Sequence, residues 1–284
     1  MINAIIILNY CDKDNTQSLV NDILNYDCIQ DIVIVDNASP DNSYDFLLKC
    51  YENHPHIHVI NTKYNGGYAY GNNIGCRYAI EVLKADYLTI ANPDITFESS
   101  TLEGMLDCAR NHEDSGCVTA KLSSDKKMLT TVWKQPTFFD CVMEAAVVMG
   151  RIYRKKIHYE MIGKEQQADV VSGAFFVINA ESYLNCGGFD EETFLYYEEN
   201  ILAKRLAKIQ KKNYVVTDVE FQHKISASID KNITDIRTKF KMAQAGRRIY
   251  LGKYLGCCKA LIVATDFVSL IGRNVYCLIS KIWD

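Results

Sequence analysis

Short apolar segments alternate with segments of helical periodicity over the first third of the chain. Four apolar runs predict buried strands, at Ala4–Leu8, Ile32–Val35, His56–Ile60 and Tyr87–Ala91. The spacing between them predicts a polar loop over Asn9–Gln17 and helices over Ser18–Tyr26, Asp41–Tyr51 and Gly67–Leu83. Such alternation is typical of βαβ units. It predicts an α/β protein with a buried, mostly parallel sheet flanked by helices.

The pattern loosens in the second half of the chain. Helices are predicted over Leu102–Arg110 and Glu198–Ile209, strands over Gly116–Leu122, Val170–Asn179 and Asn213–Phe221, and a variable region over Trp133–Arg154. From Ile236 onward the chain is expected to be helical. We therefore predict one large domain, 1–230, with halves 1–115 and 116–230, and a C-terminal helical extension, 231–284.

Polar side chains follow the predicted strands of the first half. Asn9, Asp36, Asn65 and Asp94 stand after four consecutive strands. Ligands of parallel α/β sheets bind outside the carboxyl ends of the strands. The four polar loops are therefore expected to converge on one crevice.

Composition narrows the function classes. The 284 residues are 48% hydrophobic with a net charge of −4, which suits a globular protein and argues against nucleic acid as a partner. The eleven cysteines contain no Cys-x-x-Cys pair, and Met1 leads directly into a strand without a signal peptide. Both features favour a reducing, cytoplasmic compartment.

A glycine-rich segment stands at the third strand-to-helix junction. It runs from Asn65-Gly66-Gly67 to Asn72-Asn73-Ile74-Gly75. Glycines there let the backbone approach a ligand, and a helix N-terminus favours a diphosphate. Close packing of helix on sheet is expected to explain Gly71 and Gly75. Asn72 and Asn73 are poor helix formers, so one of them is expected to face a ligand.

Two aspartates after strands each allow two interpretations. Asp36 is suited to accept hydrogen bonds from a nucleoside, but it also fits an ordinary turn before a helix that Asp41 caps. Asp94, in Asn92-Pro93-Asp94, offers the oxygen ligand that a hard divalent cation prefers. The same tripeptide is common in turns.

Two adjacent carboxylates, Glu198 and Glu199, begin a predicted helix after an aromatic run. A carboxylate of raised pKa can take the proton of an acceptor hydroxyl. The alternative is structural, because acidic residues are favoured in any first helical turn.

Taken together, these motifs resemble family-2 glycosyltransferases, within them the bacterial rhamnosyltransferase-like branch of polysaccharide assembly. The resemblance rests on Asp36–Ser39, Asn65–Asn73, Asn92–Asp94 and Gly187–Arg205, in this order and spacing. It covers about four-fifths of the chain. It implies a GT-A fold with a mixed, mostly parallel sheet, a nucleotide-diphosphate sugar donor (dTDP- or UDP-sugar, dTDP-rhamnose included), Mg2+ or Mn2+, and a single-displacement inverting mechanism.

The resemblance also implies residue roles. The base would be Glu199, next to Glu198; the metal would be held by Asp94 and His223; Tyr197 and Arg205 would contact the acceptor, a saccharide or lipid-linked saccharide. The donor would be bound by Asn9, Asp36, Asn65, Gly66, Gly67, Asn72, Asn92 and Asp94. Two positions depart from the family pattern, because Asn92 replaces the first Asp of an Asp-x-Asp motif and Ile201 replaces a frequent acid.

The C-terminal extension is basic and then apolar. Residues 237–259 hold seven Lys and Arg and no acid, and Asp266 interrupts the apolar run Ala260–Ile271, which is too short to span a bilayer. Residues 237–284 would therefore lie on an anionic membrane, at the inner face of the cytoplasmic membrane, or pack on the catalytic domain or in a homodimer.

Two other functions remain open from the sequence. Another metal-dependent nucleotide-using transferase would share the sheet, but the glycine- and Lys/Arg-rich loop expected after its first strand is absent from Asn9-Tyr10-Cys11-Asp12. A catalytically weak sugar-nucleotide-binding protein is the other, suggested by Asn92 and Ile201.

Overall fold

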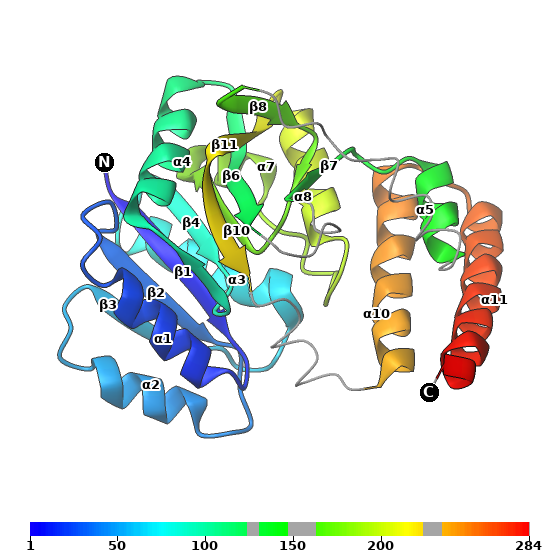
Figure 1. Cartoon of the computed structure of the whole chain (residues 1–284), viewed down its shortest axis with the longest axis horizontal. Coiled ribbons are helices and arrows are strands. Elements are labelled where there is room, and N and C mark those ends of the chain that lie inside the picture. Colours follow the sequence, from blue (N-terminus) through cyan, green and yellow to red (C-terminus); the bar gives the residue numbers. More distant parts are fainter. Residues whose placement is uncertain (124–130, 147–162, 224–234, 284) are drawn as a thin grey trace.

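The computed structural model describes residues 1–123, 131–146, 163–223 and 235–283 (Figure 1). The strands are β1 (Asn3–Asn9), β2 (Asp31–Asp36), β3 (Ile57–Asn61), β4 (Tyr87–Ala91), β5 (Ile95–Phe97), β6 (Ser115–Ser123), β7 (Val132–Trp133), β8 (Glu165–Ala168), β9 (Val170–Val171), β10 (Phe175–Asn179) and β11 (Lys212–His223). The helices are α1 (Lys13–Ile23), α2 (Ser43–Tyr51), α3 (Gly67–Glu81), α4 (Ser99–Asn111), α5 (Phe138–Ala145), α7 (Ala180–Cys186), α8 (Glu198–Lys208), α10 (Ile236–Ile249), the π-helix η1 (Tyr250–Tyr254) and α11 (Lys259–Trp283).

One large mixed sheet organises the chain before the C-terminal extension. Its strand order is β3-β2-β1-β4-β10-β6-β11-β5, with β8 on β11. The pairs of β1 with β2 and β4, and of β2 with β3, are parallel, whereas β10 runs antiparallel to β4 and β6. The predicted mixed, mostly parallel sheet is confirmed.

Helices cover both faces of this sheet. Ile5 and Ile7 of β1 are fully buried in a core shared with α1, α2 and α4. Ala4 and Ile6 point the other way, into a core shared with α3, α7 and α8. A strand whose side chains are buried on both faces has a continuous apolar sequence. The apolar run Ala4–Leu8 therefore predicts β1.

Two predicted boundaries are wrong. The first helix begins at Lys13, inside the segment expected to be a loop. Its first turn is polar and the Thr16 amide donates to the Asp12 carbonyl, so no apolar periodicity marks its start. The single strand predicted over Val170–Asn179 is two strands, β9 and β10, separated by residues 172–174. Of the predicted variable region, residues 147–154 lie outside the described part.

The N-cap residue of helix α2 lies one residue later than expected. Asn42 is the N-cap residue. The carboxylate of Asp41, one residue earlier, accepts a hydrogen bond from the Ser43 amide at 3.2 Å. Asp41 therefore stabilises the helix start without being the cap.

Helix α3 lies close against the sheet through its glycines. A Cβ on Gly71 would lie 2.3 Å from Leu8, and one on Gly75 would lie 2.6 Å from Ile6. Neither position has room for a side chain, which confirms the packing interpretation of these two glycines.

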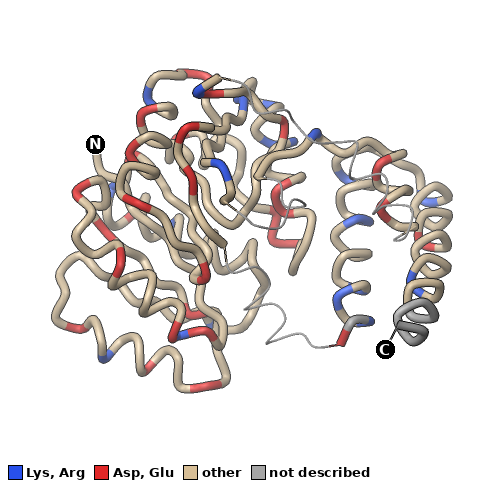
Figure 2. The backbone as a smooth tube through the Cα atoms, in the orientation of Figure 1, with Lys and Arg blue, Asp and Glu red and all other residues tan. Residues whose placement is uncertain are grey.

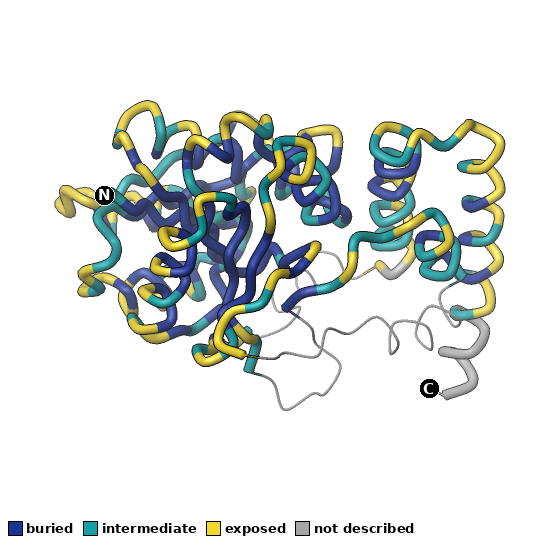
Figure 3. Tube along the Cα trace, turned by 90° about the horizontal axis from the view of Figure 1, so that it is seen from above, coloured by how far each residue is buried: buried dark blue, intermediate teal, exposed yellow. Residues whose placement is uncertain are grey.

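The C-terminal extension stands at one end of the molecule. Helices α10, α5 and α11 lie beside one another there, and α11 packs on α5 (Figures 1 and 3). Lys and Arg gather along α10, while Asp and Glu are spread over the sheet and its flanking helices (Figure 2). Among the described residues, no helix is both long and apolar enough to cross a membrane.

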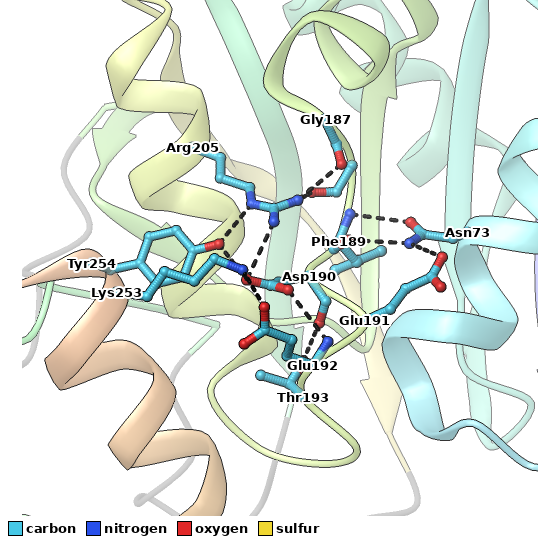
Figure 4. A network of polar contacts seen from close by, with 11 residues as sticks. Asn73, Gly187, Phe189, Asp190, Glu191, Glu192, Thr193, Arg205, Lys253 and Tyr254 are labelled. Atoms are coloured by element: carbon cyan, nitrogen blue, oxygen red, sulfur yellow. Dashed lines mark hydrogen bonds and ion pairs between the residues drawn. The ribbon is translucent and has the colours of Figure 1, made fainter.

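A network of polar contacts holds the extension to α8 and to the loop before it (Figure 4). The buried Asp190 carboxylate pairs with Arg205 of α8 at 3.2 Å and with Lys253 of η1 at 2.8 Å. Tyr254 donates to Asp190 at 2.5 Å and accepts from Arg205 at 2.9 Å. Burial opposes ionisation of Asp190, but hydrogen bonds from Lys253 and Tyr254 hold its pKa below the ordinary value.

Replacing Asp190 by Asn should destabilise the protein by about 2–4 kcal/mol at neutral pH, because Arg205 loses its buried anion while Lys253 retains Glu192. Since folding lowers the Asp190 pKa, this contribution is present above the unfolded pKa and disappears as acid protonates the folded carboxylate. Chemical denaturation measures the difference. The control Asp107→Asn removes an exposed pair with Arg110 and should change stability by less than about 0.5 kcal/mol. Equal effects of the two variants would contradict a stabilising network.

Candidate active site

The ends of β1 and β2 bring Asn9 and Asp36 together. The two are register partners, and Asn9 Nδ2 donates to Asp36 Oδ2 at 2.7 Å. The Ser39 amide donates to Asp36 Oδ1 at 2.9 Å, and the carboxylate is fully buried. Asp36 therefore orders the loop after β2. Its contact with a nucleoside stays a prediction.

Asn37 links this loop to the glycine-rich segment. Its Nδ2 donates to Asn65 Oδ1 at 3.0 Å and to the Gly67 carbonyl at 3.1 Å. Asn65 Oδ1 also accepts the Gly67 amide, and Gly66 is the N-cap residue of α3. The sequence analysis did not single out Asn37, although it stands next to Asp36.

Gly67 fits the backbone of a neighbouring loop. Its φ is +86°, and a Cβ would lie 2.1 Å from the Phe194 carbonyl oxygen. That same oxygen accepts the Tyr68 amide at 2.9 Å. The glycine-rich segment thus lies directly against the loop that leads to Glu198 and Glu199.

The two helical asparagines have different surroundings. Asn73 Nδ2 donates to the Phe189 carbonyl at 3.0 Å and to Glu191 at 2.8 Å, so it ties α3 to the 187–192 loop (Figure 4). Asn72 is fully buried and its Nδ2 donates to the Tyr68 carbonyl. Asn72 Oδ1 has no hydrogen-bond partner in the described part of the chain. A ligand contact by Asn72 stays a prediction.

Strand pairing brings Asp94 and His223 together across 129 residues of sequence. β5 begins directly after Asp94 and pairs antiparallel with the end of β11, with Ile95 opposite His223. His223 Nε2 lies 3.1 Å from Asp94 Oδ1, and the two side chains are 19% and 4% exposed. A carboxylate oxygen and an imidazole nitrogen are ligand atoms that a divalent ion such as Mn2+ accepts, with phosphate oxygens and water completing the shell. The pair therefore fits the divalent ion that the sequence implied.

The backbone before α8 is strained. Tyr196 and Tyr197 have φ values of 75° and 76°, the left-handed region that costs a non-glycine residue about 1–2 kcal/mol. This left-handed backbone sets the direction in which α8 starts, and therefore the positions of Glu198 and Glu199.

The extension and α5 hold this strained pair in place. Tyr197 donates to Glu144 of α5 at 2.6 Å, and the buried Arg247 of α10 donates to the Tyr197 hydroxyl at 3.3 Å. A Cβ on Gly246 would lie 2.4 Å from the Tyr196 carbonyl oxygen. Tyr197, which the sequence assigned to the acceptor, is 5% exposed and supports the start of α8.

Residues 173–174, between β9 and β10, join the two halves of the site. The Gly173 amide donates to Glu199 Oε1 at 3.3 Å, and the Gly173 carbonyl accepts the Tyr68 hydroxyl at 2.6 Å. The Ala174 carbonyl accepts the Asn92 amide at 2.8 Å. Adjacent residues therefore bond to Glu199 and to the Asn92–Asp94 turn, and this holds the two parts of the site next to each other. Neither Tyr68 nor Gly173 was chosen from the sequence.

The two glutamates differ in their contacts. Burial, followed by the charge of Glu199, raises the pKa of Glu198, whose side chain is 3% exposed. Its Oε1 has no hydrogen-bond partner in the described part of the chain. Burial also raises the pKa of Glu199, against the opposing hydrogen bond from Gly173. Because the charge of Glu199 further disfavours ionisation of Glu198, the arrangement suits a neutral Glu198 beside an ionised Glu199.

Arg205 and Ile201 of α8 both contact other parts of the protein. Arg205 Nη1 donates to the carbonyls of Gly187 and Gly188, both at 2.8 Å, and the guanidinium also pairs with Asp190 (Figure 4). Acceptor binding by Arg205 stays a prediction. Ile201 is fully buried against Tyr250 and its neighbours of the extension, so the acid frequent in the family would lack solvation here.

Comparison with known proteins agrees with this geometry. The family model for Glycosyl transferase family 2 matches residues 4–186. A low-salt glycan biosynthesis hexosyltransferase, Agl10, of Haloferax volcanii is 24% identical over 200 residues, 69% of this chain and 58% of that protein. An N-acetylglucosaminyl-diphospho-decaprenol L-rhamnosyltransferase of Mycobacterium tuberculosis is 23% identical over 209 residues, 68% of this chain and 66% of that protein. These alignments leave a third or more of each relative unmatched.

Solved structures share the fold. A mannosyltransferase of Pyrobaculum calidifontis, in complex with GDP-Man and Mn2+, superposes with a TM-score of 0.60 at 12% identity, over 98% of this chain and 75% of that one. GalNAc-T7 with UDP, GalNAc and Mn2+ superposes with a TM-score of 0.62 at 12% identity, over 78% of this chain and 44% of that one. Both are glycosyltransferases of the GT-A fold. The chain therefore belongs to glycosyl transferase family 2 and has the GT-A fold.

Proposed function

We propose that the protein is an inverting, metal-dependent glycosyltransferase of cell-surface polysaccharide assembly. Its donor would be a dTDP- or UDP-sugar, with dTDP-rhamnose the first to test because relatives include rhamnosyltransferases. Its acceptor would be a hydroxyl of a saccharide or lipid-linked saccharide at the cytoplasmic face of the membrane. The observation that carries the proposal is the link through residues 173–174 between Glu199 and the Asn92–Asp94 turn.

The donor would lie along the carboxyl ends of β1, β2 and β4. Asn9, Asp36 and Asn65 stand in neighbouring loops and would contact the nucleoside, and the backbone of Gly66 and Gly67 at the start of α3 would contact the diphosphate. Asp94 and His223 would hold Mg2+ or Mn2+ with the diphosphate. Such an ion neutralises the charge that develops on the leaving diphosphate.

Glu199 would be the general base. Its carboxylate would take the proton of the acceptor hydroxyl while that oxygen attacks the anomeric carbon from the side opposite the diphosphate, which inverts the configuration. The Gly173 amide holds one carboxylate oxygen, and the other would accept the proton. Glu198, kept neutral by its burial and its neighbour, would donate a hydrogen bond rather than compete for the proton.

Nucleotide binding tests the donor site. UDP, dTDP, GDP and CDP are each added with and without Mn2+ while thermal unfolding is followed. One nucleotide should stabilise the protein only together with the metal, by about 2.7 kcal/mol at a hundred times its Kd. Asp94→Ala should abolish this stabilisation, whereas Asp107→Ala, on an exposed helix position, should retain it. Stabilisation by none of the four nucleotides would rule out the proposed donor class.

Substitution of the base tests the reaction. With dTDP-rhamnose or a UDP-sugar as donor and a prenyl-diphosphate-linked N-acetylglucosamine as acceptor, Glu199→Gln should lower kcat by about 10²–10⁴-fold. The mechanism requires the glycosidic product to carry the anomeric configuration opposite to that of the donor, which NMR can assign. Glu181→Gln, in the first turn of α7, is the control and should leave kcat unchanged. Full activity of Glu199→Gln would disprove its role, and donor binding without transfer to any acceptor would favour a sugar-nucleotide-binding protein.

The pH dependence of kcat/KM is a separate test. A base must be ionised to act, and burial raises the pKa of Glu199 above its ordinary value of 4.5. Activity should therefore fall as pH drops through a pKa higher than 4.5, and the Glu199→Gln variant should lack this acid limb in its residual activity. An identical acid limb in wild type and variant would assign the titration to another group.

A further inference from the structure

Helix α11 directs its large apolar side chains toward solvent. Six of them are between 40% and 65% exposed, at Leu261, Val263, Phe267, Leu270, Ile271 and Val275. From Val263 to Val275 the spacing follows one helical face. Much of the described part of α11 is exposed, whereas the strands of the sheet are buried (Figure 3). We call these six residues the apolar face of α11.

The inner side of α11 carries small residues. Thr265 and Ser269 are 2% and 6% exposed, and a Cβ on Gly272 would lie 2.7 Å from the Ala145 carbonyl oxygen of α5. A helix at the surface of a protein surrounded by water normally has the reverse arrangement. An apolar partner of some kind therefore fits the outer face.

Basic side chains border the same face. A groove of about 310 Å3 between α10 and α11 is lined by Val263, Phe267 and Leu270 of the apolar face together with Lys241, Arg248 and Arg273. Arg248 pairs with Asp266 at 2.8 Å, whereas Lys241 is exposed. Apolar and cationic groups thus share one surface.

Charge decides which partner this surface fits. Residues 237–284 contain nine Lys and Arg against two Asp and Glu, although the whole chain carries a net charge of −4. The catalytic part is therefore strongly acidic (Figure 2). Two copies meeting through this surface would bring like charges together, which disfavours a symmetric dimer. An anionic lipid surface would attract the extension and repel the catalytic part, and so would orient the molecule.

We propose that the apolar face of α11 and the basic residues around the α10–α11 groove bind the protein to an anionic membrane. The helix would lie in the plane of the interface with Phe267 and Ile271 among the acyl chains and Lys241 and Arg273 at the headgroups. If the proposed function holds, this contact would bring the enzyme to its lipid-linked acceptor.

Vesicle binding tests the surface. The full-length protein is sedimented with phosphatidylcholine vesicles that do or do not contain phosphatidylglycerol. Binding to the anionic vesicles should be at least about tenfold tighter, because each Lys or Arg near such a bilayer contributes about fivefold, and it should weaken as salt is added. No binding, or equal binding to both vesicles, would overturn the proposal.

Matched variants locate the surface. Phe267→Ser with Ile271→Ser should weaken binding to anionic vesicles by about tenfold or more, since two exposed apolar side chains are lost. Leu184→Ser, which removes a 55% exposed side chain from α7, should leave binding unchanged. Unchanged binding by the double variant would contradict the assignment. So would a lipid-free dimer, detected by analytical ultracentrifugation, that the double variant dissociates.

The catalytic proposal fails separately. The double variant should transfer sugar to a water-soluble acceptor at the wild-type rate. Glu199→Gln should bind anionic vesicles as the wild type does. Loss of lipid binding and loss of transfer are therefore distinguishable.

Discussion

The hydrogen bonds made by residues 173–174 are the constraint on which the candidate site depends. Three segments far apart in sequence meet there, because Gly173 contacts Tyr68 and Glu199 while the Ala174 carbonyl accepts the Asn92 amide. A Cβ on Gly173 would lie 3.1 Å from both the Glu199 carboxylate and the Tyr68 hydroxyl. β9 ends at Val171 and β10 begins at Phe175. Between them, the backbone groups of Gly173 bond to Glu199 and Tyr68.

The extension takes part in the same construction. Two consecutive tyrosines in the left-handed region would relax if nothing opposed them. Tyr197 is held by Glu144 and Arg247, and Gly246 of α10 lies so close to the Tyr196 carbonyl that it has no room for a side chain. The 237–254 region thus supports the start of α8, and the outer helix α11 remains available for a lipid surface.

Part of the candidate site was predictable from the sequence because polar residues follow the buried strands directly. β1 and β2 end in Asn9 and Asp36, and Asp94 follows β4 in the turn before β5, so the apolar pattern alone predicts where these polar residues stand. The pairing of β5 with β11 places His223 beside Asp94. Gly173 and Asn37 were missed because they act through a backbone amide and a cross-loop contact that no residue pattern marks. The polar start of α1 was missed because propensity alone does not reveal a helix without apolar period.

The central claim is that Asp94 and His223 hold the ion at the site which Glu199 faces. The most direct measurement is anomalous X-ray scattering from crystals grown with Mn2+ and the nucleoside diphosphate that binds best. The account predicts one peak within about 2.5 Å of Asp94 and His223, bridged to the diphosphate. A peak only elsewhere, for example beside Cys108, His112 and Glu165, whose ligand atoms lie within 4.8 Å of one another, would contradict it.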